Sequence, residues 1–286
     1  MIISIASGKG GTGKTTVATN LALFLSGQKS QDVRFLDCDV EEPNARIFLK
    51  PEIQKSQPVN LLIPQVDRNK CTFCGECARV CAFNAIQVVL EKEVLTFPEL
   101  CHGCGGCSLL CPENAISERK REIGVLEEGR AGSVRFVQGR LNIGEPMATP
   151  VIRAVKKTIG PDGITIIDVP PGTSCPVIES VNGSEFCVLV TEPTPFGLHD
   201  LKLAVELLRK LKIKHGVLIN RAGIGDDRVQ DYCDKEGVPV LAQIPFDREV
   251  AVLYSRGIPL WSGGERFQKI FRRLWESIQT EMDADG

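Results

Sequence analysis

Eight of the twelve cysteines of this 286-residue chain lie in one short stretch and repeat a single spacing. In each run of four, two residues separate the first three cysteines and three residues precede the fourth: Cys71, Cys74, Cys77 and Cys81, then Cys101, Cys104, Cys107 and Cys111. Thiolates at this spacing bind two [4Fe-4S] clusters. A zinc site takes four ligands, and disulfide frameworks are typical of small secreted chains. Neither alternative explains the repeat, so we expect this stretch to hold two clusters.

The repeat resembles the bacterial two-cluster ferredoxin pattern, in which the fourth cysteine of each run binds the cluster of the other run. The resemblance implies that a first cluster is held by Cys71, Cys74, Cys77 and Cys111, and a second by Cys101, Cys104, Cys107 and Cys81. It also leads us to expect a helix that begins at each fourth cysteine. Pro112 follows the last cysteine as the pattern requires, whereas Ala82 replaces the corresponding proline of the first run. That replacement loosens one turn only.

A glycine-rich segment near the amino terminus predicts a phosphate site. The apolar run Ile2–Ala6 reads as a strand and leads into this segment, and a helix is expected over residues 15–25. Backbone N–H groups of such a loop surround phosphate oxygens, and the helix dipole favours the negative charge. Lys14 is expected at the β- and γ-phosphates and Thr15 at Mg²⁺. The other expected phosphate contacts are Gly8, Gly10, Gly11, Thr12, Gly13 and Thr16.

Short apolar runs alternate with helical stretches along most of the chain, which indicates an α/β fold. The expected strands are Ile2–Ala6, Val33–Asp37, Ile164–Asp168, Phe186–Thr191, 216–220 and 238–244, and the expected helices are 15–25, 198–211 and 226–236. We therefore predict a mostly parallel sheet with helices on both faces, as in P-loop NTPases.

The alternation breaks at the cysteine repeat, which also contains a probable hairpin formed by residues 87–90 and 94–97. We predict a small α+β, ferredoxin-like domain over residues 64–117, inserted into a discontinuous ATPase domain of residues 1–63 and 118–286. Loops tolerate such insertions when the termini of the inserted unit lie close together.

The segment from Lys9 to Thr16 resembles the deviant Walker A motif of the MinD, ParA and nitrogenase iron protein superfamily. The resemblance implies an ATP-sandwich dimer, either a homodimer or a heterodimer with a related ATPase, in which Lys9 reaches the partner's nucleotide. Asp39 is then expected to position the attacking water, and Asp37 to assist near the Mg²⁺ shell.

Two further segments extend the resemblance. The run from Ile166 to Gly172 matches a Walker B strand and the second switch, so Asp168 would hold Mg²⁺ through water and the Gly172 N–H would sense the γ-phosphate. The position of Asp168 at the carboxyl end of a parallel strand favours this role over that of a solvent-facing aspartate. The adenine-contacting residues implied by the resemblance are Asn220, Arg221, Pro245 and Asp247.

The remaining four cysteines need separate explanations. Cys175 lies seven residues after Asp168, the offset of a cluster ligand in the nitrogenase iron protein, but residues 142–150 supply no second cysteine. A cluster bridging a homodimer is therefore not expected. Cys38, Cys187 and Cys233 lie in or beside apolar runs and are expected to be small core residues.

Charge and hydropathy exclude several partners. The net charge of −2 gives no general attraction for nucleic acid, and no run approaches the roughly 18 apolar residues of a membrane span. The phosphate loop follows the amino terminus too closely to leave room for a signal peptide, so we expect a reducing, cytoplasmic location. Residues 265–280 read as an amphipathic helix, and we favour packing on the sheet over membrane anchoring.

Together these features predict an ATPase with ATP, Mg²⁺ and two [4Fe-4S] clusters. We expect a nucleotide-switched dimer that gates low-potential electron transfer to a partner metalloprotein. The alternative is an ATP-dependent maturation factor for a metal or iron–sulfur cofactor. A positioning ATPase of the MinD or ParA type is disfavoured, because positioning has no evident need for two redox centres.

Overall fold

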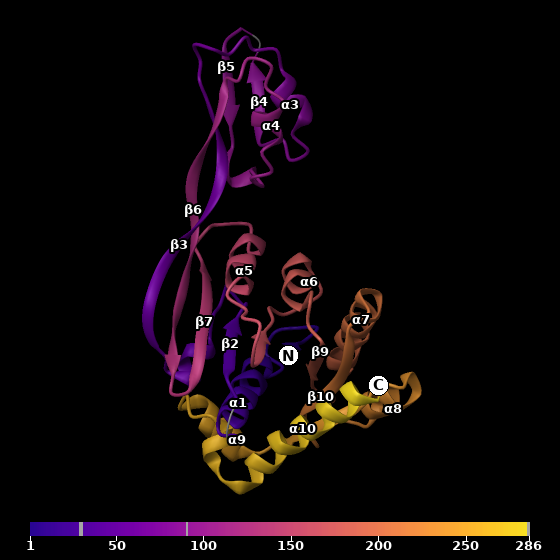
Figure 1. Ribbon diagram of the computed structural model, residues 1–286. Coiled ribbons are helices and arrows are strands. Elements are labelled where there is room, and N and C mark those ends of the chain that lie inside the picture. The colour runs from indigo at the N-terminus through magenta and orange to yellow at the C-terminus, as the bar shows by residue number, and fades with distance from the viewer. Residues whose placement is uncertain (29–30, 90, 285–286) are drawn as a thin grey trace.

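A computed structural model describes residues 1–28, 31–89 and 91–284. Within them one nine-stranded sheet has the order β11-β10-β9-β1-β8-β2-β7-β6-β3 (Figure 1). The strands from β11 to β7 are mutually parallel, whereas β6 is antiparallel to both β7 and β3. The parallel strands are β1 (Ile2–Ala6), β2 (Val33–Asp37), β7 (Val134–Leu141), β8 (Ile164–Asp168), β9 (Phe186–Thr191), β10 (Lys214–Ala222) and β11 (Val240–Pro245).

Helices cover both faces of this sheet, which confirms the predicted fold class. On one face lie α1 (Lys14–Ser26), the 3-10 helix η2 (Leu260–Gly263) and α10 (Glu265–Asp283). On the other lie α5 (Thr149–Lys156), α6 (Cys175–Val181), α7 (Pro195–Leu211) and α8 (Arg228–Glu236). Two short helices, α2 (Ala45–Leu49) and α9 (Arg248–Ser255), complete this part of the structure. Because central strands are buried on both sides, they read as continuous apolar runs, and every residue of β9 is buried.

The last helix, α10, packs its apolar stripe into the core. Phe267, Phe271, Leu274 and Ile278 are each at most 1% exposed and belong to the same core as β1 and α1. This confirms the interpretation of residues 265–280 as a helix packed on the sheet.

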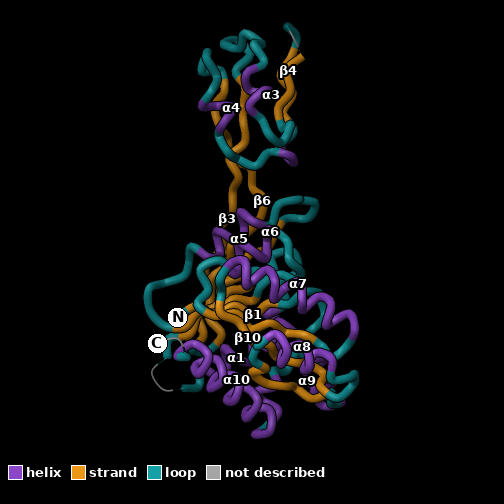
Figure 2. Tube along the Cα trace, turned by 90° about the vertical axis from the view of Figure 1, so that its right-hand side faces the viewer, coloured by secondary structure: helices purple, strands orange, loops and turns teal. Residues whose placement is uncertain are grey.

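Two long strands leave the body together, as Figures 1 and 2 show. They are β3 (Glu52–Val66) and β6 (Ile116–Ala131), and their ladder runs from Glu52↔Arg130 to Val66↔Ile116. Because β7 pairs with β6 only from Gly124 onward, residues 60–66 and 116–123 form a two-stranded arm. The arm carries residues 67–115, which are here called the head. The chain outside the arm and the head is called the body. The sequence analysis predicted neither β3 and β6 nor β7.

The head is built from short elements: α3 (Glu76–Val80), β4 (Ile86–Val89), β5 (Glu93–Thr96), the 3-10 helix η1 (Pro98–Leu100) and α4 (Gly106–Leu109). The β4–β5 hairpin confirms the predicted one with strands placed one residue earlier, and predicted residue 90 lies outside the described residues. The expectation that the fourth cysteines begin helices is wrong. Cys81 and Cys111 follow α3 and α4, because Cys77 and Cys107 already lie within those helices.

Candidate nucleotide and cluster sites

The phosphate loop joins the carboxyl end of β1 to the first turn of α1. Gly11 and Gly13 have φ values of 79° and 93°, a region that L side chains rarely adopt. A Cβ at Gly13 would also lie 2.3 Å from Asn220 Nδ2. No side chain caps α1 at Gly13, so its first N–H groups are available to phosphate oxygens. This part of the loop therefore suits an anion.

Lys14 lies at the centre of a group of carboxylates. Its Nζ is 3.0 Å from Asp168 Oδ1 and 3.3 Å from Asp39 Oδ2, and the side chain is buried. Burial alone would lower the pKa of Lys14, but Asp168 and Asp39 more than offset it and raise that pKa. The lysine is thus charged and paired with two carboxylates at the position where phosphate oxygens are expected.

Asp37 is the last residue of β2, and Asp39 lies two residues beyond it. Asp37 is fully buried, and its two oxygens accept hydrogen bonds from the Asp39 N–H at 3.1 Å and the Ala45 N–H at 3.2 Å. Burial, with Asp168 adding to it, raises the pKa of Asp37 well above its usual value. Burial also raises the pKa of Asp39, against the opposing effect of Lys14. Asp37 therefore orients the backbone of this segment, while Asp39 faces the lysine.

The donor set fits a hydrated Mg²⁺ ion. Asp168 Oδ2 is buried without a hydrogen-bond partner, although Oδ1 of the same carboxylate accepts from Lys14. Thr15 follows Lys14 in the first turn of α1. A carboxylate oxygen and a hydroxyl beside a phosphate site are ligands that suit Mg²⁺. The Gly172 N–H, with φ 98°, donates to Ser7 O at 3.0 Å, so the second switch segment touches the loop.

Lys9 pairs with a residue that the sequence analysis did not single out. Lys9 Nζ is 3.7 Å from Glu192 Oε2, and Arg221 Nη1 is 2.7 Å from Glu192 Oε1. The Glu192 side chain is only 8% exposed and directly follows β9. The sequence signal that could have identified Glu192 is its charge, directly after the buried strand β9. Within one chain, Glu192 therefore holds both Lys9 and the predicted adenine-contacting Arg221.

The other predicted adenine contacts divide into two kinds. Asn220 Nδ2 donates to Thr12 O at 2.7 Å, which ties the end of β10 to the phosphate loop. Pro245 pairs with Ala222 in the β10–β11 ladder. Asp247 caps α9 by accepting from the Glu249 N–H at 2.7 Å and pairs with Arg266 at 3.0 Å. The carboxylate of Asp247 thus has structural contacts, and its contact with a nucleotide stays a prediction.

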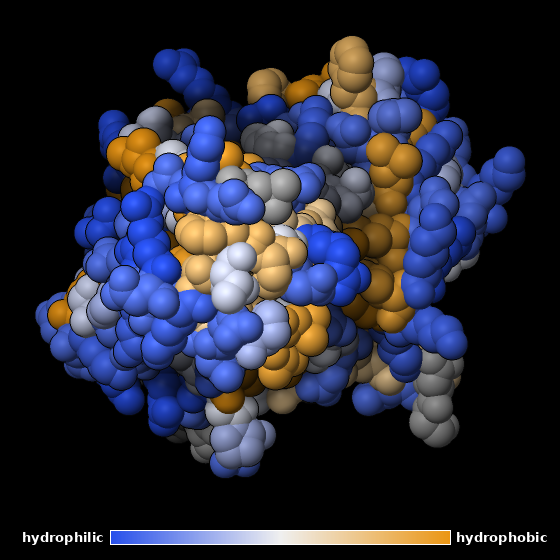
Figure 3. All heavy atoms as spheres, turned by 90° about the horizontal axis from the view of Figure 1, so that it is seen from above, coloured by the Kyte–Doolittle hydropathy of each residue, from blue (hydrophilic) through white to orange (hydrophobic). Residues whose placement is uncertain are grey.

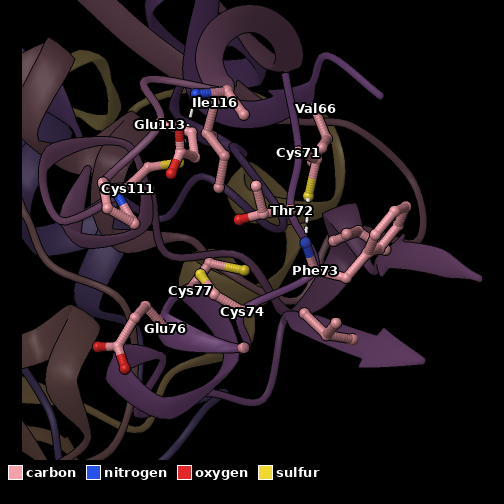
Figure 4. A pocket seen from close by; sticks show the side chains of 15 residues that line it. Val66, Cys71, Thr72, Phe73, Cys74, Glu76, Cys77, Cys111, Glu113 and Ile116 are labelled. Atoms are coloured by element: carbon pink, nitrogen blue, oxygen red, sulfur yellow. Dashed lines mark hydrogen bonds between the residues drawn. The ribbon is translucent and has the colours of Figure 1, made fainter. Parts of the chain in front are cut away.

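In the head, four cysteines line each of two cavities. The first, here called the distal cavity, is lined by Cys71, Cys74, Cys77 and Cys111, with Val66 and Ile116 at the end of the arm (Figure 4). The second, the proximal cavity, is lined by Cys81, Cys101, Cys104 and Cys107, with Leu62 and Glu118 of the arm. The structure thus groups the cysteines into the same two sets that the sequence resemblance implies.

Backbone N–H groups donate to sulfur atoms in both cavities. The N–H of Phe73 lies 3.4 Å from Cys71 Sγ, and those of Gly103, Ala85 and Ala115 lie 3.5, 3.2 and 3.3 Å from the Sγ atoms of Cys101, Cys81 and Cys111. Such bonds stabilise thiolate charge, which suits iron ligands. Burial raises the pKa of the Cys77 and Cys107 thiols. Among residues 1–28, 31–89 and 91–284, no three His, Cys, Asp or Glu side chains surround one point as a single metal ion requires.

The cysteines outside the head behave as expected of small apolar residues, except for Cys175. Cys38, Cys187 and Cys233 are fully buried, and burial raises the thiol pKa of Cys187 to about 12 and of Cys233 to about 11. Their prediction as core residues is confirmed. Cys175 is exposed at the first residue of α6.

Seen from the head end, the surface has apolar side chains gathered near its middle and hydrophilic ones around them (Figure 3). The exposed apolar residues of the head include Phe83, Leu109 and Leu110. None of the helices that the structure describes is long and apolar enough to cross a bilayer.

Comparisons with known proteins point to one family. The CobQ/CobB/MinD/ParA nucleotide-binding domain matches residues 3–260. Two uncharacterised proteins of Methanocaldococcus jannaschii are 32% and 30% identical to this chain, covering 98% and 90% of it and 96% and 90% of their own lengths. An iron–sulfur cluster carrier protein of Pyrococcus abyssi is 24% identical over 99% of this chain and 88% of its own length.

Solved structures show the same fold. The cell division ATPase MinD of Pyrococcus furiosus has a TM-score of 0.58 at 23% identity, covering 98% of both chains. The septum site-determining protein MinD of Pyrococcus horikoshii, complexed with Mg-ADP, has a TM-score of 0.59 at 22% identity, covering 100% of this chain and 98% of that one. At this identity the likeness concerns the fold alone.

Proposed function

The chain belongs to the CobQ/CobB/MinD/ParA nucleotide-binding domain family, and on that premise we propose that it is an ATP-hydrolysing iron–sulfur protein. Its nucleotide-switched dimer gates the transfer of low-potential electrons to a partner metalloprotein. The head, in this proposal, is a two-[4Fe-4S] domain inserted into the ATPase domain.

One observation carries the proposal: two complete sets of four cysteines line separate cavities in the head. The arm that bears the head belongs to the same sheet as β1, which leads into the phosphate loop. Four thiolates per cavity supply one ligand to each iron of a [4Fe-4S] cluster. A fully ligated cluster is retained rather than released, and it exchanges one electron at a time. Electron transfer therefore fits these closed sites better than cluster donation does.

The body residues have distinct tasks in this proposal. Phosphate oxygens displace Asp168 and Asp39 from Lys14, and the freed Asp168 oxygens then hold the water shell of Mg²⁺ beside Thr15. Asp39, no longer paired with Lys14, becomes free to orient the attacking water. Release of the hydrolysis products reverses the exchange and lets the ion pairs described above form again.

Dimerisation assigns a role to Lys9. In the single chain its ammonium is held near Glu192, at 3.7 Å and with 32% of the side chain exposed. This contact is weak enough to exchange for a phosphate of the partner's nucleotide. The dimer would then form only when nucleotide occupies the loop, which makes it a switch.

The test is an anaerobic redox titration of the clusters, followed by electron paramagnetic resonance, with and without MgATP. A nucleotide-dependent shift of the reduction potential by about 59 mV supports gated electron transfer, because it is a tenfold change in the equilibrium constant of a one-electron couple. Identical potentials with and without nucleotide would count against gating at the clusters.

A second candidate is supported by the relatives named iron–sulfur cluster carrier proteins. In that case the head would pass a cluster to an acceptor instead of passing an electron. The loaded protein is mixed with a cluster-free acceptor ferredoxin and MgATP, and the two are separated. Iron found in the acceptor favours the carrier, whereas iron that stays with this chain favours electron transfer.

A further inference from the structure

The arm meets the body through a buried, bidentate ion pair. Arg121 on β6 donates from Nη1 to Glu145 Oε1 at 2.5 Å and from Nη2 to Glu145 Oε2 at 2.8 Å. The two side chains are only 17% and 12% exposed. Glu145 lies in the loop between β7 and α5, so the pair joins the arm to the body. Paired forks of this kind fix orientation as well as distance.

The loop that holds Glu145 is also bonded to the nucleotide site. The Leu141 N–H donates to Val40 O at 2.8 Å, and the Asn142 N–H donates to Ile123 O at 2.9 Å. Val40 directly follows Asp39, whose carboxylate is paired with Lys14. A movement of Asp39 away from Lys14 therefore acts on a backbone that is bonded to the Glu145 loop.

Arg121 is also the ladder partner of Leu61 on the neighbouring strand β3. Leu61 packs against the proximal cavity, because a Cβ at Gly103 would lie 2.7 Å from Leu61 Cδ1. Gly103 stands between Cys101 and Cys104, two residues that line that cavity. Packing thus continues from the ion pair to the proximal cysteines.

The two cavities differ in how they connect to the body. Leu61 and Cys101 belong to one continuous core that also contains Leu36 of β2 and Val151 of α5. Cys77 and Ile116 at the distal cavity form a separate small core with Ile86, and the proximal Cys81 and Cys107 also pack against it. Rigid packing transmits displacements through contacts, and Cys101 of the proximal cavity shares its core with the body, whereas Cys77 and Ile116 of the distal cavity do not.

We propose that Arg121 and Glu145 are positioning residues that lock the arm to the body, so that nucleotide binding at Asp39 is sensed at the proximal cysteine cavity and not at the distal one. This deepens the proposed function and rests on it, since it states which cysteine set responds to ATP.

Hydrogen exchange of the full-length protein tests the lock. Amides of residues 117–123 are followed with and without Mg²⁺ and a non-hydrolysable ATP analogue. In the wild type the nucleotide should slow their exchange by about fivefold or more. In Arg121→Gln that effect should vanish, while residues 39–42 remain protected by nucleotide. The control is Lys55→Gln, which removes an exposed pair with Glu128 on the same ladder and should leave the effect intact.

Replacing one partner leaves the other charge buried and unpaired, which can weaken the fold. The reversed pair, Arg121→Glu with Glu145→Arg, avoids this and should restore the response of the arm. A wild type in which residues 39–42 respond and residues 117–123 do not would overturn the proposal. So would a folded Arg121→Gln protein whose arm responds as the wild type does.

A second readout separates this inference from the electron-gating function. The spectrum and potential of each cluster are recorded with and without the same nucleotide, in the wild type and in Arg121→Gln. The inference is supported if nucleotide changes only the proximal cluster in the wild type, and if this change is lost in Arg121→Gln at unchanged iron content. Nucleotide-dependent potentials that persist in Arg121→Gln overturn it and leave electron gating intact. An arm response lost in Arg121→Gln, with clusters indifferent to nucleotide, supports the lock between arm and body but overturns both the response of the proximal cavity and electron gating.

Discussion

Lys14 Nζ lies 3.0 Å from Asp168 Oδ1, so the lysine that should bind phosphate is already engaged with the carboxylate that should bind Mg²⁺. Each group thus neutralises the charge of the other. MgATP supplies both a phosphate for the lysine and a cation for the carboxylate. We therefore expect nucleotide binding to exchange the partners of both groups, so that neither buried charge is left unpaired.

Lys14→Ala is expected to abolish ATP hydrolysis and to leave cluster content unchanged, because the lysine and the cysteines lie in different parts of the structure. Phosphate release and iron per chain measure the two properties. Lys210→Ala, which removes a surface pair with Glu206, is the control and should keep both. Loss of iron in Lys14→Ala would show that the sites are not separate.

Glu192→Gln should favour the ATP-bound dimer. The change releases Lys9, whose side chain is partly exposed, from its 3.7 Å contact with the buried Glu192 carboxylate. A pair of this kind contributes about 1 kcal/mol or less, so dimerisation should strengthen by up to about fivefold. Sedimentation velocity at several protein concentrations with MgATP measures it, with Glu206→Gln as the control. Weaker association of Glu192→Gln would mean that Glu192 acts across the dimer instead of within the chain.

Serine replacements test how the cysteines are shared between clusters. Cys81→Ser should damage the same cluster as Cys101→Ser, and Cys111→Ser the same cluster as Cys71→Ser, because each pair lines one cavity. Each variant should lose up to about half of the iron while still binding nucleotide. Electron paramagnetic resonance identifies the damaged cluster, and Cys233→Ser, in the core of the body, should change neither. Identical spectra for Cys81→Ser and Cys71→Ser would refute the interleaved assignment.

His215 should make the body less stable in mild acid. Burial lowers the pKa of this imidazole below its usual 6.5, so the unfolded chain binds the proton more readily than the folded one. The free energy of unfolding is then unaffected well above pH 6.5 and falls as the pH drops through 6.5 toward the folded-state pKa. Urea unfolding at pH 7.5 and 5.5 should show a smaller difference for His215→Asn than for the wild type. His199→Asn, at an exposed histidine, should resemble the wild type.

The sequence allowed the body to be predicted wherever local pattern and burial agree. Residues of β1, β8 and β9 are buried on both faces, so each strand reads as an apolar run. The phosphate loop is equally local, because its glycines meet steric requirements that are written in consecutive residues, such as that of Gly13 beside Asn220. The grouping of cysteines in the two cavities agrees with what the resemblance to the two-cluster ferredoxin pattern implies.

The arm was missed because its signal is weak and non-local. Most of β3 is exposed, and its buried side chains are those of Leu61, Ile63 and Pro64. Exposure alternates over residues 57–63, but the sequence does not mark this alternation, because the exposed Leu62 is as apolar as its buried neighbours. Its partner β6 lies beyond the whole head in sequence, and no turn marks the pairing. The contacts of Arg121 with Glu145 and of Lys9 with Glu192 depend on that tertiary arrangement, which single-residue patterns do not encode.

The arm also has a mechanical consequence. Both of its strands continue the hydrogen-bonded ladder of the body, so the head is attached at two adjacent points and not by a single flexible linker. Rotation about one bond cannot swing such a head. It can be displaced only by bending or twisting the ladder, and a bent ladder tends to spring back. The cysteine cavities therefore have a preferred resting position relative to the ATP site, and any excursion toward a partner is made against an elastic restoring force.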